Sequence, residues 1–411
     1  MSERSRGPLD GLRVVDMSTT LMGPYAGLLL AQLGADVIKV ERPGGDIARQ
    51  IGDRSGVGLG ECYVNFNRGK RSVVLDVSNA SDADLLDEMI ADADVFSHNL
   101  RPSTARKLGL SYDSLAPSSP RLVYCSMHGF DQRGPWRDKP AYDDTIQAAA
   151  GIAAMQGGSK GEPPAYVKTP MADKTVGVFA VAAILAALHE REASGLGQEV
   201  SVPMFETMAA FTAMEQQGGT VFDPPQGSYG YARMDSPHRR PYQTADGYLA
   251  VLVYTDRQWE NFFSYIEKPD LIADERFRTI GRRTENIDEL YALVADALPA
   301  QSTEEWLRVF DQIDIPATPI MNISEVITSP QSLASELFEV VDHPVLGPLR
   351  QPGMPITFSR TPPAPATPAA LLGADTAAVR NQLGRFGRTI PRLADQSADC
   401  DHYQGVCHDL T

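Results

Sequence analysis

One aspartate stands directly before the longest apolar run of the chain. Asp173 lies within residues 169–177 (Thr-Pro-Met-Ala-Asp-Lys-Thr-Val-Gly), and the run 176–188 follows. Because Pro170 cannot continue a helix from upstream, a helix is expected to begin near Asp173. A carboxylate there is either an N-cap that accepts bonds from free N–H groups or a nucleophile held in the field of the helix dipole. From these residues alone the cap is favoured, because aspartate is among the commonest caps.

A second acidic pair lies upstream, in residues 140–144 (Pro-Ala-Tyr-Asp-Asp), at the start of a helix predicted over 142–154. Asp143 and Asp144 are well placed to cap that helix. The alternative is chemical, since a second carboxylate close to Asp173 would raise its pKa or position a substrate.

Basic side chains are concentrated in the first third of the chain, several of them close to predicted strand ends. Ligands of open α/β sheets bind at the carboxyl edge of the strands, where arginine and lysine suit phosphate groups. The alternative is a solvated surface paired with carboxylates, which is slightly favoured for these residues taken alone. The residues are Arg42, Arg68, Lys70, Arg71, Arg101, Arg106 and Lys107.

Motifs for several other chemistries are missing or weak. The spacing of Cys400, His402, Cys407 and His408 matches no standard zinc arrangement, so no metal is expected. The first strand lacks a following G-x-G-x-x-G, which argues against a nicotinamide cofactor. The sequence has no P-loop and no G-x-S-x-G elbow, so triphosphatase and serine hydrolase functions have no motif behind them.

The elements that must position these residues alternate between strand and helix. Helices are predicted at 25–33, 81–91, 142–154 and 204–214, and this alternation predicts an α/β fold with a parallel sheet. A stretch rich in glycine and proline, 216–241, predicts a domain boundary. Residues 343–347 are expected to be connecting chain. The predicted strands cover residues 12–16, 37–41, 72–76, 95–98, 122–126 and 198–202.

Composition narrows the class of protein. A chain of 411 residues favours two domains. The net charge of −16 argues against a general nucleic-acid binder or a protein of anionic membranes. The first 30 residues lack a signal pattern, so a cytoplasmic protein is expected. The apolar run 176–188 is predicted to be too short to span a bilayer.

Taken together, several ordered motifs resemble the class III CoA-transferases. This family includes formyl-CoA and carnitine CoA-transferases and also the α-methylacyl-CoA racemases. The similarity runs from residue 8 to about residue 384. Its most specific pieces are residues 34–43 (Gly-Ala-Asp-Val-Ile-Lys-Val-Glu-Arg-Pro), 67–72, 141–143, 171–177 and 195–200.

The resemblance implies an architecture. A large Rossmann-like domain with a parallel sheet is expected from residues 1–225 and 341–411, with a smaller α+β domain from 226–340. It also implies a homodimer whose subunits thread through each other as interlocked rings. No tightly bound cofactor is implied, because coenzyme A and its acyl thioesters are the substrates.

The resemblance also implies roles for individual residues. Asp173 corresponds to the nucleophile, which attacks a donor thioester to give a mixed anhydride and then an aspartyl-CoA thioester. With this resemblance the nucleophile becomes the favoured role, and helix capping becomes its geometric support. Tyr142 and Asp143 correspond to the family's tyrosine–acid pair. The family's CoA contacts correspond to Arg42, Arg71, Asn99 and Arg106.

Two departures from formyl-CoA transferase bear on the substrate. Leu21 stands where that enzyme has glutamine, and only Gly227 and Gly230 are near its glycine-rich flap. Both argue against oxalate or formate and suggest a larger or less polar acyl group. The sequence names neither the donor nor the acceptor.

Two other functions stay open. A 2-methylacyl-CoA racemase needs an acid/base pair, and the racemases have a histidine at the position of Tyr142. His128 is nearby in sequence but is expected to be a structural histidine at a strand end. A catalytically silent CoA-binding protein is the second alternative, and an intact Asp173 argues against it. The transferase is the favoured function.

Overall fold

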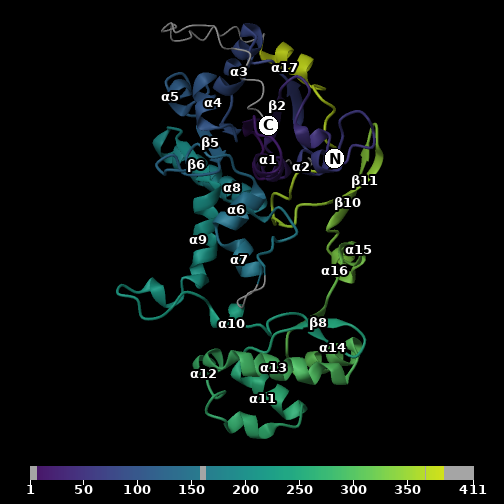
Figure 1. Cartoon of the computed structure of the whole chain (residues 1–411). Helices are drawn as coiled ribbons and strands as arrows, with labels where there is room; N and C mark the ends of the chain where they lie inside the picture. Colours follow the sequence, from purple (N-terminus) through teal and green to yellow (C-terminus); the bar gives the residue numbers. More distant parts are fainter. Residues whose placement is uncertain (1–6, 158–162, 366, 384–411) are drawn as a thin grey trace. The chain divides into compact units, whose positions relative to one another are not determined.

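The computed structural model describes residues 7–157, 163–365 and 367–383. Within these residues six parallel strands form one sheet in the order β3-β2-β1-β4-β5-β6 (Figure 1). This is the usual Rossmann order, which reverses direction between β1 and β4 and leaves a crevice at their carboxyl ends. The six predicted strands are confirmed as β1 Arg13–Asp16, β2 Asp36–Glu41, β3 Arg71–Val74, β4 Val95–His98, β5 Val123–His128 and β6 Glu199–Pro203.

The four inner strands, β2, β1, β4 and β5, are buried on both faces, whereas the edge strand β6 has Glu199 and Ser201 exposed. Val14 and Val15 of β1 and Val95 and Phe96 of β4 are at most 1% exposed, which explains why they read as continuous apolar runs rather than alternating ones. The helices that accompany the sheet are α1 Met22–Gln32, α2 Glu61–Phe66, α3 Ala80–Ala91, α4 Pro102–Lys107, α5 Tyr112–Leu115, α6 Asp143–Ala149, α8 Met171–Ser194, α9 Met204–Gln216 and α17 Thr376–Leu383.

The prediction of a single helix over 142–154 is wrong. It is divided into α6 and α7 (Ile152–Gln156), with Gly151 between them at φ 84°. Only glycine adopts this left-handed conformation without steric cost, so the residue ends one helix and redirects the next.

The longest helix, α8, is a core element beside the sheet. It has 24 residues, and an 18-residue stretch of it has a mean hydropathy of 1.8, so by length and composition alone the helix is able to cross a membrane. The predicted apolar run 176–188 is only the middle of this helix, and its being too short to span a bilayer stays a prediction. In the structure α8 packs against α1, α6, β5 and β6.

The contacts divide the described chain into two units. The first combines residues 7–150, 168–209, 333–365 and 367–383, and the second combines 151–157, 163–167 and 210–332. Residues 151–157, 163–167 and 210–225 thus group with the second unit, whereas the sequence prediction had them in the large domain. The division at 225/226 and 340/341 stays a prediction.

The second unit has its own aromatic core, in which Trp259, Phe262, Trp306 and Phe310 are at most 1% exposed. A small antiparallel sheet accompanies its helices. Its elements are α10 Ala232–Asp235, β7 Tyr242–Gln243, β8 Tyr248–Val251, α11 Asp256–Tyr265, α12 Ile280–Glu285, α13 Ile287–Ala297, α14 Thr303–Gln312, β9 Ala317–Pro319 and α15 Ile323–Thr328; α16 Pro330–Ala334 follows where the two units meet in sequence.

The C-terminal part of the chain returns to the first unit. Strands β10 Phe338–His343 and β11 Gly347–Pro352 form an antiparallel hairpin, so the predicted connecting chain at 343–347 is the turn of that hairpin. Farther on, Asp375 and Thr376 accept the backbone N–H groups of Ser72 and Val74 at 2.9 and 3.0 Å. The exposed edge of β3 is thereby covered by side chains from the end of the described chain.

Candidate active site

A buried network of charges lies at the carboxyl ends of β1 and β2. Lys70 Nζ is 3.0 Å from Asp16 Oδ2, and Lys39 Nζ is 2.9 Å from Asp46 Oδ2. All four side chains are at most 1% exposed. Because an unpaired charge in such a place is costly, these groups fix one another's positions.

The network holds the loop between β1 and α1. Asp16 Oδ1 accepts the Ser18 N–H at 3.0 Å, and Asp46 Oδ1 accepts the Thr20 N–H at 3.1 Å. Asn99 pairs with the Thr19 backbone in both directions, at 2.9 Å each. Thr20 has φ 71°, which is rare and strained for a β-branched residue. The surrounding hydrogen bonds therefore hold the loop in one conformation.

A second buried pair continues the network. Arg49 Nη2 donates to Glu41 Oε1 at 2.7 Å, and the hydroxyls of Tyr63 and Ser72 donate to the same oxygen at 3.1 and 2.7 Å. Burial favours the neutral acid, but the Arg49 hydrogen bonds and the Lys39 charge lower the pKa of Glu41 to about 2. The sequence analysis did not single out Arg49; its only signal is a cation shortly after β2.

A cavity of about 430 Å³ opens beside this loop, at the carboxyl ends of β1, β4 and β5. It contains two of the predicted site residues, Asn99 and Tyr142. Its rim carries three cations, Arg101, Arg137 and Lys139. Arg137 and Lys139 were not among the predicted basic residues, because nothing in the composition of their segment shows that it lies at this cavity.

The nucleophile candidate and the acidic pair are brought together. Helix α8 begins after Pro170, so Asp173 is its third residue and not its N-cap, which corrects the prediction. The capping role falls to Asp143, whose Oδ1 accepts the backbone N–H of Asp173 at 2.9 Å. A carboxylate from another helix thus satisfies a free N–H group in the first turn of α8. Asp143 and Asp144 themselves lie in the first turn of α6, after Tyr142.

The Asp173 carboxyl is half-buried among negative charges. Burial raises its pKa to about 7, and the charges of Asp143 and Asp144 act in the same direction. No described residue donates a hydrogen bond to its side chain, in contrast to the paired acids of the buried network. A poorly solvated carboxylate without a partner is a reactive nucleophile once it is deprotonated.

One glycine allows α8 to approach the first loop. A Cβ on Gly177 would lie 2.9 Å from the carbonyl oxygen of Met22 and 3.2 Å from the ring of Tyr25. Contacts of that length force the backbone to shift. Gly177, one turn after Asp173, therefore lets α8 lie directly against the start of α1. Asp173 is in consequence held near the loop that borders the cavity.

Comparison with known proteins identifies the family. A family profile described as CoA-transferase family III matches residues 9–376. The chain belongs to CoA-transferase family III. The resemblance predicted from the motifs is confirmed, and the chain is a class III CoA-transferase.

Individual relatives of this transferase are similar over almost their whole length. The succinate–glutarate CoA-transferase of Agrobacterium fabrum is 33% identical over 395 residues, covering 93% of this chain and 97% of that protein. The acetyl-CoA:oxalate CoA-transferase of Acetobacter aceti is also 33% identical, covering 87% and 90%. The crystal structure of a CAIB/BAIF family protein from Brucella suis has 31% identity and a TM-score of 0.77, covering 92% of this chain and 99% of that one.

The structure separates the predicted CoA contacts of the transferase. Asn99 lines the cavity, and Arg106 is exposed on α4, whose first residues Pro102 and Ser103 line it. Arg42 follows the carboxyl end of β2. Arg71 instead begins β3 at the opposite edge, where its Nη2 is 2.6 Å from Asp36 Oδ2. The sequence analysis did not separate the two ends of this strand.

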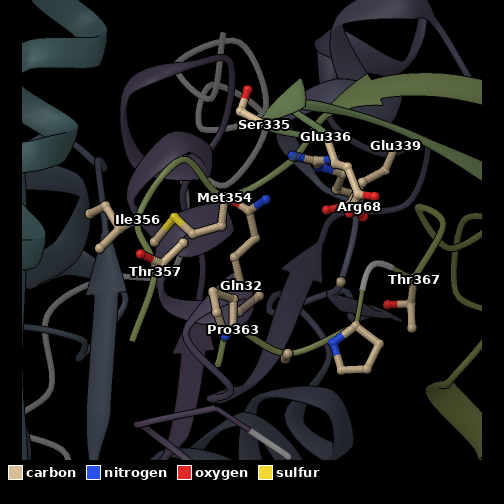
Figure 2. Close-up of a pocket in the computed structure, with 14 residues that line it drawn as sticks. Gln32, Arg68, Ser335, Glu336, Glu339, Met354, Ile356, Thr357, Pro363 and Thr367 are labelled. Carbon is tan, nitrogen blue, oxygen red and sulfur yellow. The ribbon is translucent and has the colours of Figure 1, made fainter. Parts of the chain in front are cut away.

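Two other cations of the predicted basic group have structural partners. Lys70 belongs to the buried network. Arg68 is 3% exposed and donates to the carbonyl of Pro352, which joins the segment before β3 to the hairpin. It borders a second cavity of about 350 Å³, where Glu336 and Glu339 lie beside it (Figure 2). Negative charge on that wall disfavours phosphate, so this cavity is a poor candidate for CoA.

His128 is the one predicted structural residue that also borders the main cavity. It is 8% exposed, and its Nε2 is 3.4 Å from Ser201 Oγ, while Nδ1 has no partner among the described residues. Burial lowers the pKa of the imidazole, so the ring is neutral at pH 7. The predicted tail residues lie outside the residues that the structure describes; these are Cys400, His402, Cys407 and His408. Among the described residues there is no cluster of three or more side chains that could bind a metal ion.

Proposed function

We propose that this transferase moves CoA from an acyl-CoA thioester to a free carboxylic acid, with Asp173 as the covalent nucleophile. The observation that carries the proposal is the half-buried Asp173 carboxyl at the start of α8, with its pKa raised to about 7 and no hydrogen-bond donor among the described residues. Tyr142, 57% exposed in the cavity wall, and Asp143, which fixes the helix start, support the same site.

The first half of the reaction transfers CoA to the enzyme. A carboxylate oxygen of Asp173 attacks the donor thioester carbonyl, the C–S bond breaks, and the thiolate leaves with the electron pair. The product is an anhydride between the acyl group and Asp173. The thiolate then attacks the aspartyl carbonyl of the anhydride, which releases the donor carboxylate and leaves an aspartyl-CoA thioester.

The second half reverses these steps with the acceptor. The acceptor carboxylate attacks the aspartyl thioester and displaces the thiolate, which gives a new anhydride. The thiolate then attacks the acceptor carbonyl, so that acceptor-CoA forms and the Asp173 carboxylate is regenerated. No oxidant, reductant or cofactor is needed, and the free N–H groups of a helix start suit the oxyanions that form.

The main cavity is the proposed site for the CoA portion. Arg101, Arg137 and Lys139 on its rim suit the phosphates, and Arg42 and Arg106 are proposed as further contacts. Asn99 acts by holding the Thr19 backbone as well as by lining the cavity. Arg71 has only the family resemblance behind it, because it is paired with Asp36 at the other edge.

The substrate class is proposed from two of the relatives and from one departure, although the acetyl-CoA:oxalate CoA-transferase is also 33% identical. Enzymes named for succinate with glutarate and for succinyl-CoA with mesaconate are 32–33% identical to this chain. Leu21, where formyl-CoA transferase has glutamine, argues against oxalate. We therefore propose a dicarboxylic acid longer than oxalate as donor or acceptor.

We propose that the enzyme is cytoplasmic and that it assembles as a homodimer, interlocked as in the family resemblance. Val178 and Phe179 of α8 are 49% and 48% exposed, in a helix whose apolar 18-residue stretch is 44% buried. An apolar patch on a central helix favours a second copy of the chain as its cover. Light scattering of the wild type and of Phe179→Glu tests this, and a wild-type monomer would reject the dimer.

The deciding experiment for the chemistry is covalent trapping. The protein is incubated with succinyl-CoA, acetyl-CoA and longer acyl-CoA thioesters, treated with hydroxylamine or borohydride, and mapped by peptide mass spectrometry. A modified Asp173 in the wild type and none in Asp173→Asn is expected. Exchange between a thioester and an acid without any modification of the Asp173 peptide would refute the covalent route.

The racemase alternative has one observation in its favour, the unpartnered Nδ1 of His128 at the cavity. Proton abstraction at the α-carbon would incorporate deuterium from heavy water. Deuterium uptake by a 2-methylacyl-CoA, lost in His128→Asn, would favour the racemase. Acyl transfer without uptake favours the transferase.

A further inference from the structure

A chain of hydrogen bonds links the core of α6 to the start of α8. Gln147 Nε2 donates to Asp143 Oδ2 at 2.6 Å, and Asp143 Oδ1 accepts the N–H of Asp173 at 2.9 Å. Each oxygen of the Asp143 carboxylate therefore has a donor from a different direction. A carboxylate held at both oxygens has a fixed plane, whereas one with a single donor is free to rotate.

Gln147 is placed to act as a rigid support. It is 0% exposed, and it lies four residues after Asp143, on the same face of α6. Helix α6 packs against α8. The buried amide has no solvent to exchange with, so its orientation is set by the packing of the two helices.

We propose that Gln147 is a positioning residue for the transfer reaction, acting through Asp143 on the start of α8 and thereby on Asp173. The proposal rests on the proposed role of Asp173 as nucleophile. Gln147 touches no reacting atom in this arrangement, so its removal is expected to affect the chemical step more than CoA binding.

The test compares Gln147→Leu and Gln147→Met, which keep most of the volume and remove the N–H donor. Turnover is measured with succinyl-CoA as donor and glutarate as acceptor. The expected result is a fall in kcat of about 10–100-fold, the size that a small misplacement of a catalytic group produces. The KM for succinyl-CoA is expected to change by less than about threefold, because the cavity residues stay in place.

A double-mutant cycle separates positioning from general destabilisation. If Gln147 acts through Asp143, Asp143→Ala/Gln147→Leu loses no more activity than Asp143→Ala alone, within about twofold. Gln351→Leu is the matched control, because Gln351 is 2% exposed and donates to the carbonyl of Val64 at 2.8 Å, away from the site. The control is expected to lower Tm without lowering kcat at a temperature where it is folded.

Three outcomes would overturn the proposal. These are unchanged kcat in both Gln147 variants, multiplicative losses in the double variant, and equal kcat losses in Gln147→Leu and the control at matched fractions folded. If both Gln147 variants fail to fold, the amide is a structural residue and the proposal is likewise rejected. Covalent trapping on Asp173 of the wild type is measured independently. Failure of the proposed nucleophile Asp173 is therefore distinguishable from failure of the proposed positioning role of Gln147.

Discussion

Two groups of carboxylates near the same edge of the sheet differ in whether a cation is paired with them. Asp16, Asp46 and Glu41 are buried, and each is paired with a lysine or arginine. The group of Asp143, Asp144 and Asp173 has no such cation within hydrogen-bond distance among the described residues, and its charges repel one another. The pKa of Glu41 is lowered to about 2, and that of Asp173 is raised to about 7.

The difference shows which acids build the fold and which are available for chemistry. Pairing removes the reactivity of a carboxylate, because its lone pairs are already engaged. Repulsion and burial have the reverse effect, and they cost stability that the paired network must offset. In this transferase the charged motif residues of β2 and of the segment before β3 fix a loop, whereas the acids of α6 and α8 are the ones proposed to take part in the reaction.

The largest expected effect is on the unpaired side. Asp173→Asn keeps the shape of the side chain and the backbone N–H bond to Asp143, but removes the nucleophile. CoA transfer is expected to fall by at least about 1,000-fold, as when a covalent nucleophile is removed. CoA affinity, measured by calorimetry, is expected to change little. Turnover within tenfold of the wild type would show that Asp173 is not the nucleophile.

The second effect is on the paired side and concerns stability. Glu41→Gln leaves Arg49 buried with a weaker partner, which is expected to lower the free energy of unfolding by about 3–5 kcal/mol. Urea unfolding measures it. Arg278→Met is the control, because its ion pair with Glu275 is 66% and 80% exposed and is worth at most about 1 kcal/mol. Equal losses in the two variants would contradict the comparison.

The pH dependence of activity is the third effect. A nucleophilic Asp173 has to be ionised, so the proposal predicts that kcat/KM rises as the pH increases through about 7. Asp144→Asn removes a repelling charge, so the rise is expected to move to lower pH by a fraction of a unit up to about one unit. Lys174→Gln is the control with the opposite change of charge, because it removes a cation next to Asp173. A profile unchanged by Asp144→Asn would remove Asp144 from the electrostatics of the site.

The smallest expected effect concerns how the stability of the protein changes with pH, because Glu41 and Asp173 contribute with opposite signs. Glu41, with its folded pKa below the ordinary 4.5, contributes stability that is lost as the pH falls from about 4.5 towards 2. Asp173 has its folded pKa raised above 3.8, so its contribution is lost as the pH rises from about 4 through 7. Asp173→Asn is therefore expected to raise Tm by a few degrees at pH 8 and by less at pH 5. Calorimetric scans at both values check this.

The sequence predicts the sheet well and the site only in part. The inner strands are recognisable because both faces are buried, which produces short apolar runs, whereas the edge strand β6 is marked by valines that alternate with the exposed Glu199 and Ser201. Asp173 is found because a proline and an apolar run mark the start of its helix. That Asp143 caps this helix is not predictable, because the two residues lie 30 positions apart on separate helices. The direction of a strand also decides which edge of the sheet a residue lies at. Arg71 was predicted to bind CoA, but it begins β3 and so lies at the edge opposite to the carboxyl ends.

The last feature is the way in which the C-terminal part covers β3. Ser72 and Val74 donate to Asp375 and Thr376, so during synthesis β3 has a free edge until nearly the whole chain has left the ribosome. An uncovered edge strand readily pairs with other chains. A protein truncated before residue 370 is thus expected to aggregate even though all residues of the reaction site are present, and chaperone demand should be greatest late in translation.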